Sequence, residues 1–564
     1  MRLPTRGTAL LSAALAATVA LGACKSSSEG GGGGTNGGAG AGTDLNDVTP
    51  TPYVHVRDGG MLRWPIDSFP ANFNVDEVEG NERNVTDLMF STLPTVWYFD
   101  SRSKPVLNTE LVDRTEQTST DPQVITYHIN PKAMWSDGAP ITWLDFKAQV
   151  SALSGRDKAF KIASSTGYEQ VGSVERGATD RDVKLTFTTK FPDWRSLFTP
   201  LTPASLNADA NAFNTSWISG PTVSGGPFKV DKIDKVDETI TVVRNEKWWG
   251  QRPKLDRIEF VVLDQGATAK AFRAGQVDLV DIDSDAAALA TVRTVAGATV
   301  HKAVGPDWRQ IDLGARGPMA DVKVRQAVML AIDREGDAKA QLTPLSGPAS
   351  LLDSHFWMTS QAQYKSTCEA FCKRNVVLAG TLLESAGFTR GADGIYAKNG
   401  RPFAVEFLIP SGVTRSESEA RLQETALRAA GIKVIVKTVP ADRFLPDYVL
   451  TGQFDLTIFS WIGTQFPISF ARSVYFSNGD RNYARIGTAE IDALFDQAPT
   501  QLNRAKATEL THQIDRKIWE EGHSVALYQE PELVATRSGL VNFGAFGFAG
   551  GASPRNYVPI GFKG

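Results

Sequence analysis

Apolar stretches with strand-like and helix-like spacing alternate over most of the chain, which favours α/β folding units. The run at 454–461 has the apolar and β-branched content of a buried strand, and Gly463 and Pro467 then break it into a loop. Nearer the N-terminus, the pattern predicts a turn and a first strand at 59–64, a short helix at 84–93 and a strand at 124–129.

The loop after the strand at 454–461 is the first candidate for a ligand site. In an open α/β sheet, ligands bind in the crevice beyond the carboxyl ends of the strands. A loop that begins with an indole at this place is a natural pocket wall. Trp461 is therefore a candidate ligand contact, together with Thr464 and Gln465 in the same loop. The alternative is that Trp461 is only a core residue.

A second candidate site is the polar loop at 70–80, which contains the aromatic residue Phe73 and the acid Glu79. Binding groups commonly lie on loops of this kind. Glu79 could equally be a solvated surface acid, which is what most glutamates are.

The N-terminal residues predict export. The segment 1–20 carries Arg2 and Arg6, no acidic residue, and an alanine and leucine run too short to span a bilayer. It ends in Leu-Gly-Ala-Cys at 21–24, which resembles a bacterial lipobox, so residues 1–23 are interpreted as a lipoprotein signal peptide and Cys24 as the lipidated residue. The alternative is an ordinary signal followed by a chance cysteine.

The segment that follows is interpreted as a tether. Residues 25–42 are almost entirely serine and glycine, and the whole stretch 24–52 is expected to be a flexible coil with a reach on the order of 30 Å. The folded body would then be extracytoplasmic, anchored to the cell membrane by lipid at Cys24. No later segment is apolar enough to cross a membrane.

Composition and charge argue against nucleic-acid binding and indicate more than one domain. The formal net charge of −4 becomes −6 once residues 1–23, with two arginines and no acid, are removed. No basic patch has interleaved aromatic residues, so we expect no nucleic-acid partner. A hydrophobic content of 42% in 564 residues is ample for two or three domains.

The two remaining cysteines, Cys368 and Cys372, are four residues apart. In an oxidising compartment this spacing favours a local disulfide over free thiols, since one turn of helix or a loop brings the Cα atoms into bonding range. A zinc site would need two more ligands, and the nearest histidine, His355, does not have metal-site spacing. We therefore expect neither a metal nor another cofactor.

The most specific motif lies at 134–146. Its Ser-Asp-Gly at 136–138 predicts a tight turn that needs a positive φ at Gly138, and Thr142 is placed to cap a helix with apolar positions at 143, 146 and 150. The motif resembles the W-S-D-G-x-P-[IV]-T-x-x-D-[FV] signature of the peptide-binding family of extracellular solute-binding proteins. These are receptors of ATP-binding cassette importers for oligopeptides, dipeptides and nickel complexes.

Further matches follow in the family's order, so that the resemblance covers the chain from about 59 to 548. They are S-G-G-P-F at 224–228, R-N-E-K-W-W at 244–249, a helix, glycine and exposed-aspartate step at 272–278, D-V-K-V-R-Q-A with A-I-D-R at 321–334, and L-E-S-A-G-F at 383–388. We expect most of these to be packing and ion-pair elements. They identify the fold without locating the pocket.

The resemblance implies an α/β fold of the two-lobed periplasmic-binding-protein type, type II, in the large peptide-binder class with an extra subdomain. Lobe I would comprise 53–90, 215–312 and 524–564, with an inserted subdomain at 91–214, and lobe II would comprise 313–523. The chain would cross between the lobes near 311–317 and again near 525–530. A ligand would then stabilise the closed state of a hinge.

The resemblance also sharpens the loop after Trp461. Peptide binders of the family show a W-x-x-D-x-x-x-P-like pattern whose aspartate pairs with the ligand's α-amino group, whereas this chain has Thr464 at that place. An unpaired ammonium in a closed cleft is costly. Either Glu79 or Asp312 supplies the negative charge, or the ligand has no free amino terminus there. Arg472 could attract a carboxylate or phosphate, or be a surface arginine.

These observations favour a lipid-anchored receptor, expected to be a monomer. It would capture oligopeptides in an inter-lobe cleft and pass them to the transmembrane permease subunits of an ATP-binding cassette importer. A non-peptide solute such as an oligosaccharide, siderophore or metal chelate is the alternative. An exported enzyme or cell-wall scaffold on the same fold is less favoured, because S-x-x-K at 101–104 lacks its companion motifs and H-E-x-x-H and G-x-S-x-G are absent.

Overall fold

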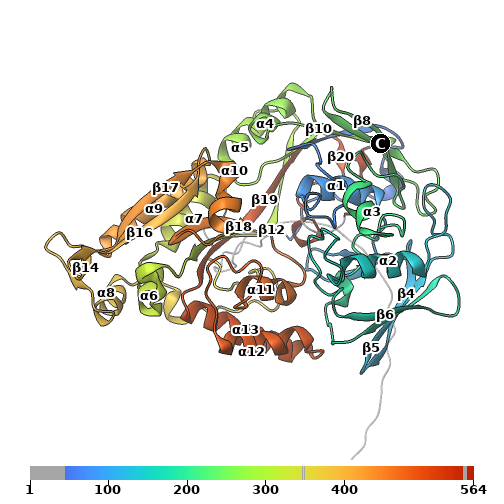
Figure 1. The fold of residues 1–564 in the computed structure, drawn as a ribbon. Coiled ribbons are helices and arrows are strands. Elements are labelled where there is room, and N and C mark those ends of the chain that lie inside the picture. Colours follow the sequence, from blue (N-terminus) through green and yellow to red (C-terminus); the bar gives the residue numbers. More distant parts are fainter. Residues whose placement is uncertain (1–44, 346, 348–349, 551–554) are drawn as a thin grey trace, which may run out of the picture. The chain divides into compact units, whose positions relative to one another are not determined.

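The computed structural model describes residues 45–345, 347, 350–550 and 555–564 (Figure 1). The predicted signal peptide, Cys24 and the tether up to residue 44 lie outside the described residues. Within the described part, none of the helices combines the length and apolar character that a membrane span requires.

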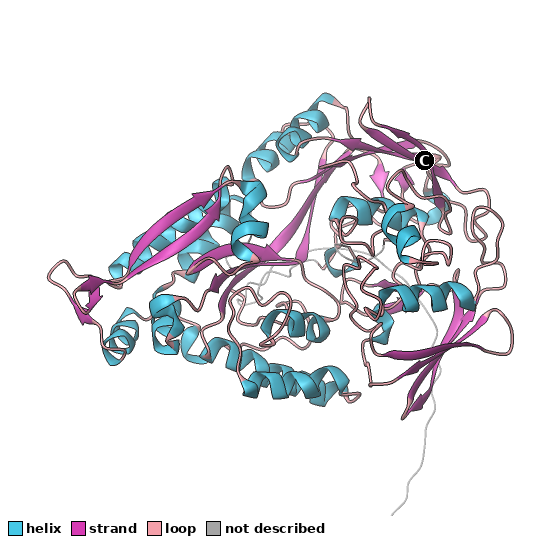
Figure 2. Cartoon of the chain, in the orientation of Figure 1, coloured by secondary structure: helices cyan, strands magenta, loops and turns pink. Residues whose placement is uncertain are grey.

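The first sheet has the strand order β1-β10-β9-β8. Its strands are among the magenta ones at the upper right of Figure 2. Its strands are β1 (Met61–Ile66), β10 (Arg257–Val262), β9 (Thr239–Arg244) and β8 (Phe228–Asp234). β1 runs parallel to β10, and the other two pairs are antiparallel. Burial alternates along β1, so one face of the strand joins the core. Helix α1 (Arg83–Thr92) packs close to β8.

The predicted inserted segment forms a second, antiparallel sheet in the order β4-β5-β7-β6. It comprises β4 (Val112–Thr120), β5 (Gln123–Ile129), β7 (Asp182–Phe187) and β6 (Val171–Arg176). The turn and helix predicted next to it are confirmed. Gly138 has φ +91°, and Thr142 with Asp145 forms a capping box at the start of α2 (Trp143–Leu153). This sheet shares one hydrophobic core with β1, β9 and β10.

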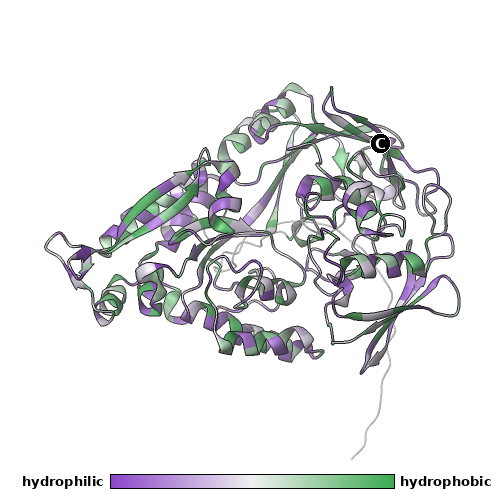
Figure 3. Ribbon diagram, in the orientation of Figure 1, coloured by the Kyte–Doolittle hydropathy of each residue, from purple (hydrophilic) through white to green (hydrophobic). Residues whose placement is uncertain are grey.

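The largest sheet has six strands in the order β11-β19-β12-β18-β16-β17. Its members are β11 (Leu279–Asp281), β19 (Ser524–Thr536), β12 (Thr299–Leu313), β18 (Leu456–Trp461), β16 (Ala404–Pro410) and β17 (Lys433–Val439). β12 and β19 are antiparallel, whereas β16 runs parallel to both of its neighbours. In Figure 3 the strands β16 and β17 are mainly hydrophobic, and helices such as α13 (Arg504–Glu520) mix both classes, as amphipathic helices do.

The hydrophobic cores change along β12 and β19. On β12, the residues from Trp308 onward belong to the core of lobe II. On β19, the residues 525–528 join that core, while Leu533 and Val534 pack into clusters of lobe I. The pairing of the two strands is irregular between Val304 and Trp308. The passage between the lobes therefore lies at about 304–308 on β12, before the predicted crossing at 311–317, and at 529–532 on β19, next to the predicted 525–530.

The remaining elements surround these sheets. The helices are α3 (Ala210–Thr215), α4 (Gln265–Ala274), α5 (Ala286–Arg293), α6 (Val322–Ala331), α7 (Arg334–Leu342), α8 (Val376–Ser385), α9 (Thr414–Ala429), α10 (Ala441–Arg443), α11 (Pro467–Tyr475) and α12 (Ala489–Gln497). The short strands are β2 (Trp97–Phe99), β3 (Pro105–Leu107), β13 (Thr389–Arg390), β14 (Tyr396–Lys398), β15 (Arg401–Pro402), β20 (Leu540–Val541) and β21 (Gly561–Phe562).

The sequence motifs serve packing, as expected, with one correction. Arg334 is buried and binds Asp353 at 2.9 Å, so the A-I-D-R motif is an ion-pair element. Asp278, which the motif predicted to be exposed, is instead 5% exposed. Its carboxylate receives two hydrogen bonds from the Arg63 guanidinium and one from the Arg63 backbone. The pair ties the turn before β11 to β1, which explains why the aspartate is drawn inward.

Candidate ligand-binding cleft

The loop after β18 connects the two lobes through side chains. The Phe466 ring packs edge-on against Phe99 of lobe I, with ring centroids 5.5 Å apart. Three residues later, the Ser469 hydroxyl donates a 2.6 Å hydrogen bond to the Asp193 carboxylate. The strand that precedes the loop belongs to the core of lobe II. The loop is therefore an inter-lobe contact at the carboxyl end of a central strand, the position that the sequence pattern indicated.

Three cavities follow this loop, and each has walls from both lobes. The acidic cavity, of about 230 Å³, lies beside Ile462 and Asp307 and is completed by residues 75–90, 199 and 200. The central cavity, of about 590 Å³, lies between 464–481 and residues 164–170. The basic cavity, of about 250 Å³, lies between 465–468, the start of α13 and residues 102–105 and 192–195. The central and basic cavities share Phe466 in their walls, and all three border the same loop, where they offer space for a small solute.

The acidic cavity is lined by three acids, Asp76, Glu82 and Asp307, and burial affects the carboxyls of Asp76 and Asp307 most clearly. Asp307 accepts a hydrogen bond from the Gly463 backbone at 3.2 Å, and Asp76 accepts one from Gln149 at 3.2 Å. Burial raises the pKa of both carboxyls to about 7. Arg83 also lines this cavity, but it pairs with Asp281 at 2.8 Å. Within the described part of the chain, neither Asp76 nor Asp307 forms an ion pair, so both remain available to a cationic group.

Comparison with known proteins decides the family. The family described as "Bacterial extracellular solute-binding proteins, family 5 Middle" matches residues 106–483. The "Oligopeptide-binding protein OppA" of Mycobacterium tuberculosis H37Rv is 36% identical over 528 residues, which are 93% of this chain and 88% of that protein. The chain belongs to the family 5 extracellular solute-binding proteins. A more distant relative, the "Uncharacterized lipoprotein Rv2585c" of the same organism, is 22% identical over 72% of this chain and 77% of its own length.

The same fold is found among solved structures. The "Periplasmic EDTA-binding protein EppA" superposes with a TM-score of 0.84 and 26% identity, over 93% of this chain and 99% of that one. The two-lobed, type II architecture that the sequence motifs implied is thus confirmed. As a family 5 solute-binding protein, the chain is a receptor of an ATP-binding cassette importer, and the family consists of binding proteins.

Trp461 lies mostly within the core of this solute-binding protein. Its side chain is 8% exposed, stacks on Tyr483 at 5.8 Å and meets Phe459 and Phe470 edge-on. Of the two alternatives for Trp461, this position corresponds to a core residue behind the cleft. The residues that directly follow it line the cavities instead, beginning with Ile462, which is 52% exposed.

Thr464 and Gln465 reach the cleft. Thr464 lines the central cavity, and its hydroxyl accepts a 3.2 Å hydrogen bond from the Phe466 backbone. Gln465 lines the basic cavity, and its amide donates to the Phe548 carbonyl at 2.8 Å. Thr464 is therefore oriented by the loop itself, and Gln465 by the segment that contains Phe548.

The structure places three other candidates away from the cavities. Phe73 is 1% exposed because it packs in the core of lobe I. Glu79 is exposed on the turn beside it, and its backbone N–H donates to Glu77. Asp312 is 1% exposed within β12 and accepts a 2.6 Å hydrogen bond from Gln310. The described linings of the three cavities contain none of these residues, whereas Asp76 and Asp307 line the acidic cavity.

Arg472 lines the central cavity but is already paired. Its guanidinium binds Asp496 at 2.8 Å and lies 3.9 Å from the centroid of the Phe476 ring. Of the two alternatives for Arg472, the geometry corresponds to a surface ion pair.

Cys368 and Cys372 form a disulfide across a short turn, with Cα atoms 5.0 Å apart. Asp353 lies close enough to complete a group of three conceivable metal ligands among the described residues. A disulfide offers no thiolate, however, and Asp353 pairs with Arg334. The group therefore does not fit a metal ion.

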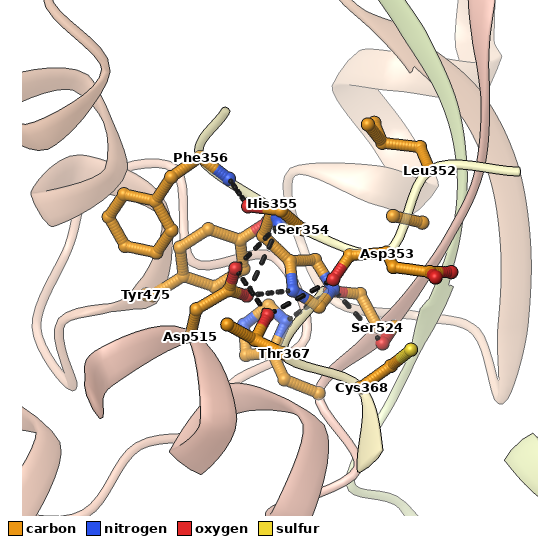
Figure 4. A network of polar contacts seen from close by, with 12 residues as sticks. Leu352, Asp353, Ser354, His355, Phe356, Thr367, Cys368, Tyr475, Asp515 and Ser524 are labelled. Atoms are coloured by element: carbon orange, nitrogen blue, oxygen red, sulfur yellow. Dashed lines mark hydrogen bonds and ion pairs between the residues drawn. The ribbon is translucent and has the colours of Figure 1, made fainter. Parts of the chain in front are cut away.

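A buried His–Asp pair among the core residues of lobe II is structural (Figure 4). His355 Nδ1 lies 2.7 Å from Asp515, and Thr367 donates to the same carboxylate at 2.7 Å. His355 Nε2 faces the backbone carbonyl of Ser524 and not a hydroxyl. Both members of the pair have fully buried side chains. The arrangement links segment 352–368 to α13 and lacks the exposed nucleophile that acyl-transfer chemistry requires.

Sequence reasoning missed the residues that carry the cleft's charge. Asp76, Asp307, Arg195 and Arg504 come from four separate segments, and they meet only in the folded chain. One local signal was present for Asp307, which follows a Gly-Pro pair inside the strand β12.

Proposed function

We propose that this receptor captures oligopeptides in the cleft beside residues 462–468 and delivers them to its importer. One observation carries the proposal: the cavities along the loop are lined from both lobes and have opposite charge at their two ends. An extended peptide carries an ammonium at one end and a carboxylate at the other. The oligopeptide-binding relative, at 36% identity, supports the same ligand class.

The acidic cavity is suited to the amino terminus. Asp307 and Asp76 offer carboxylates that hold only neutral hydrogen-bond donors, so an ammonium would gain charge-assisted hydrogen bonds there. The central cavity is wide, and waters in a space of this size can replace direct contacts to side chains. The receptor would then accept many peptide sequences and bind chiefly their main chain and ends.

We propose the lobe division 53–90, 215–307 and 529–564 for lobe I with its inserted subdomain at 91–214, and 308–528 for lobe II, which moves the boundaries predicted at 312 and 524 to the change of hydrophobic core. The changes of hydrophobic core along β12 and β19 support two bodies joined near Asp307 and Glu530. Because ligand contacts come from both bodies, binding would favour their closed arrangement.

The experiment that tests the function is identification of bound ligand. We expect mass spectrometry of the natively purified full chain to detect short peptides. Equilibrium dialysis against a pentapeptide library with neutral side chains should show retention that unlabelled peptides displace. Absence of peptide from the purified protein, together with no retention in dialysis, would refute the proposal.

A second candidate is a non-peptide polycarboxylate such as a metal chelate. It is favoured by the EDTA-binding structure, which is 26% identical with a TM-score of 0.84. Dialysis with EDTA and with its iron(III) complex, run beside the peptide library, distinguishes the two. Retention of the chelate alone would assign the cleft to this class.

We further propose that the receptor is held at the outer face of the cell membrane by lipid on Cys24. The lipobox-like residues 21–24 and the relative described as a lipoprotein support the anchor. Labelling cells with an alkyne fatty acid should mark the native chain, whereas Cys24→Ala should remain unlabelled and leave the membrane fraction. Equal labelling of both chains would exclude this anchor.

A further inference from the structure

Four charged side chains meet where the chain passes between the lobes. They are Arg309 of β12, Arg415 and Glu419 of α9, and Glu530 of β19. Their side chains are between 0% and 19% exposed. Charges buried to this extent are costly unless they pair with one another. None of the four belongs to the described linings of the acidic, central and basic cavities, so this charged cluster is not a wall of the cleft.

Lobe II balances only part of the charge by itself. Arg309 Nε donates to both carboxylate oxygens of Glu419, at 2.9 and 3.1 Å, and the Tyr528 hydroxyl donates to the same carboxylate at 3.0 Å. The Arg415 guanidinium lies 3.3 Å from Glu419 as well. Asp337 adds at most part of a charge at neutral pH, because burial and the charge of Glu419 raise its pKa to about 7. One carboxylate thus serves two guanidiniums.

The second acid comes from the stretch of β19 that leaves lobe II. Glu530 lies in the passage at 529–532 and accepts two hydrogen bonds from Arg415, at 3.1 and 3.2 Å. Arg415 also donates at 2.7 Å to the hydroxyl of Ser284 in lobe I, which itself donates to Glu530 at 3.1 Å. Ser460 of β18 donates to Glu530 too. Burial raises the pKa of Glu530, but the charge and hydrogen bonds of Arg415 outweigh it, and the pKa falls to about 2.

Lobe I has the opposite imbalance beside the same passage. The pKa of Asp283 is raised chiefly by the charge of Asp281, and Glu530 raises it further. The pKa of Asp307 is raised chiefly by burial, and again Glu530 adds to the shift. These four acids share the charge of Arg83, which pairs with Asp281 at 2.8 Å. Negative charge on lobe I therefore meets positive charge on lobe II at the passage.

We propose that Arg415 is a positioning residue, which holds α9 of lobe II against Glu530 and Ser284 of lobe I and thereby populates the closed arrangement before a ligand binds. Hydrogen bonds weaken steeply with distance and angle, so even a small rotation at the passage breaks these contacts. Arg415 would then keep only its share of Glu419. Affinity for any ligand that contacts both lobes rises with the fraction of closed receptor. The proposal rests on the two-lobed fold and holds for any class of ligand.

Hydrogen–deuterium exchange of the ligand-free full chain tests this role. The segments 192–196 and 462–470 meet across the cleft through the hydrogen bond between Asp193 and Ser469. In Arg415→Gln, we expect exchange in both segments to become at least about fivefold faster, because the lobes separate more often. Faster exchange confined to α9 would indicate a purely local role and would overturn the proposal. Unchanged exchange in all segments would overturn it as well.

Two further variants separate the charge of Arg415 from its packing. Arg415→Lys keeps a cation beside Glu530 and should exchange nearly as slowly as the native chain. Exchange as fast as that of Arg415→Gln would mean that charge is not responsible, which refutes the proposal. Ser284→Ala removes only the hydroxyl of lobe I, so it should speed exchange in both segments roughly twofold. If Arg415→Gln does not fold, the absence of this smaller rise decides against the proposal.

The matched control is Arg428→Gln, which makes the same change of charge at an exposed position in the last turn of the same helix. It should leave exchange at 192–196 and 462–470 as in the native chain. Faster exchange there, equal to that of Arg415→Gln, would assign the effect to the charge or stability of α9 as a whole and refute the specific role of Arg415.

Retention of the neutral pentapeptide library separates this proposal from the peptide function. If the library binds, Arg415→Gln should lower its affinity roughly 5- to 30-fold for free and end-blocked peptides alike, and Arg428→Gln should not. Equal affinity of the native and Arg415→Gln chains would overturn the proposal while the peptide function stands. If no peptide binds but exchange changes as expected, the role of Arg415 holds and the peptide function fails.

Discussion

The acidic and basic cavities lie along the same loop and differ in how their charges are held. In the acidic cavity, Asp76 and Asp307 accept hydrogen bonds from an amide side chain and a backbone N–H. In the basic cavity, Arg195 stacks on two indoles. Neutral partners fix the orientation of a charged group without neutralising it. Arg472, which lines the central cavity, is instead paired with an acid. Under the proposed function, ion pairing, more than the presence of charge, separates the groups that would contact the ligand from structural ones.

The largest loss of peptide affinity is expected from a substitution in the acidic cavity. Asp307→Asn keeps the acceptor for the Gly463 backbone but removes the charge, so affinity for peptides with a free amino terminus should fall roughly 10- to 100-fold. Affinity for N-acetylated peptides should change little. Because the pKa of Asp307 is raised to about 7, affinity of the native chain for free-amino peptides should also rise from about pH 5.5 to about pH 7 as the carboxyl ionises.

The control for this end is Asp237→Asn, at an exposed turn far from the cavity lining in sequence. It should leave binding of both peptide forms unchanged. If Asp307→Asn lowers the affinity for acetylated and free peptides equally, the acidic cavity does not bind the amino terminus and the comparison of the two ends fails.

Removal of the aromatic contact between the two lobes should cause the next largest loss of peptide affinity. Phe466→Ala deletes the aromatic contact with Phe99 across the cleft, and we expect affinity to fall roughly 3- to 10-fold for both free and end-blocked peptides. Isothermal titration measures the change. Phe476→Ala, which removes the ring beneath Arg472, is the matched control and should have a much smaller effect. A loss that depends on the peptide's end groups would show that Phe466 acts through charge positioning instead.

A substitution of Asp312 tests whether a buried carboxylate outside the cleft affects stability without affecting peptide binding. Burial also raises its pKa to about 7, but it is 1% exposed and lies within β12. The folded pKa lies above the unfolded one, so its contribution to the free energy of unfolding is complete below about pH 4 and is lost as the pH rises through about 7. Asp312→Asn should therefore flatten the fall in stability between about pH 5 and pH 8, on the order of 2 kcal/mol, with unchanged peptide affinity. Urea unfolding at both pH values measures it, and an unchanged slope would contradict this account.

The smallest change in peptide affinity is expected from a substitution of Arg472. Its pair with Asp496 is partly exposed, and exposed pairs contribute about 0–1 kcal/mol, so Arg472→Gln should change affinity by roughly twofold at most. A tenfold loss of affinity for carboxylate peptides would move the anionic end of the ligand from the basic to the central cavity.

Local features of the fold could be predicted from the sequence because they depend on neighbouring residues. The turn at Gly138 and the helix capped by Thr142 are set by residues within one short motif. The strand β18 and the loop after it followed from an apolar run that ends at Gly463. The family motifs then fixed the two-lobed arrangement.

The chemistry of the site could not be predicted in the same way. Asp76 and Asp307 are separated by more than two hundred residues, as are Arg195 and Arg504, and nothing in the local sequence marks either pair. Phe73 and Trp461 were plausible ligand contacts by position, but their large apolar surfaces are buried in the cores. Aromatic residues in the sequence thus indicate where a cleft lies better than they indicate which side chains line it.

The interrupted pairing between β12 and β19 constrains how the receptor can move. The two strands pair regularly up to Val304, the pairing is interrupted between Val304 and Trp308, and the register shifts once more between Arg309 and Gln310. Bending about an axis across the interruption disturbs few hydrogen bonds, whereas a twist or a slide would disrupt the paired segments on either side. We therefore expect the lobes to move by one hinge rotation. The importer would then encounter the receptor either open or closed, without a range of intermediate arrangements.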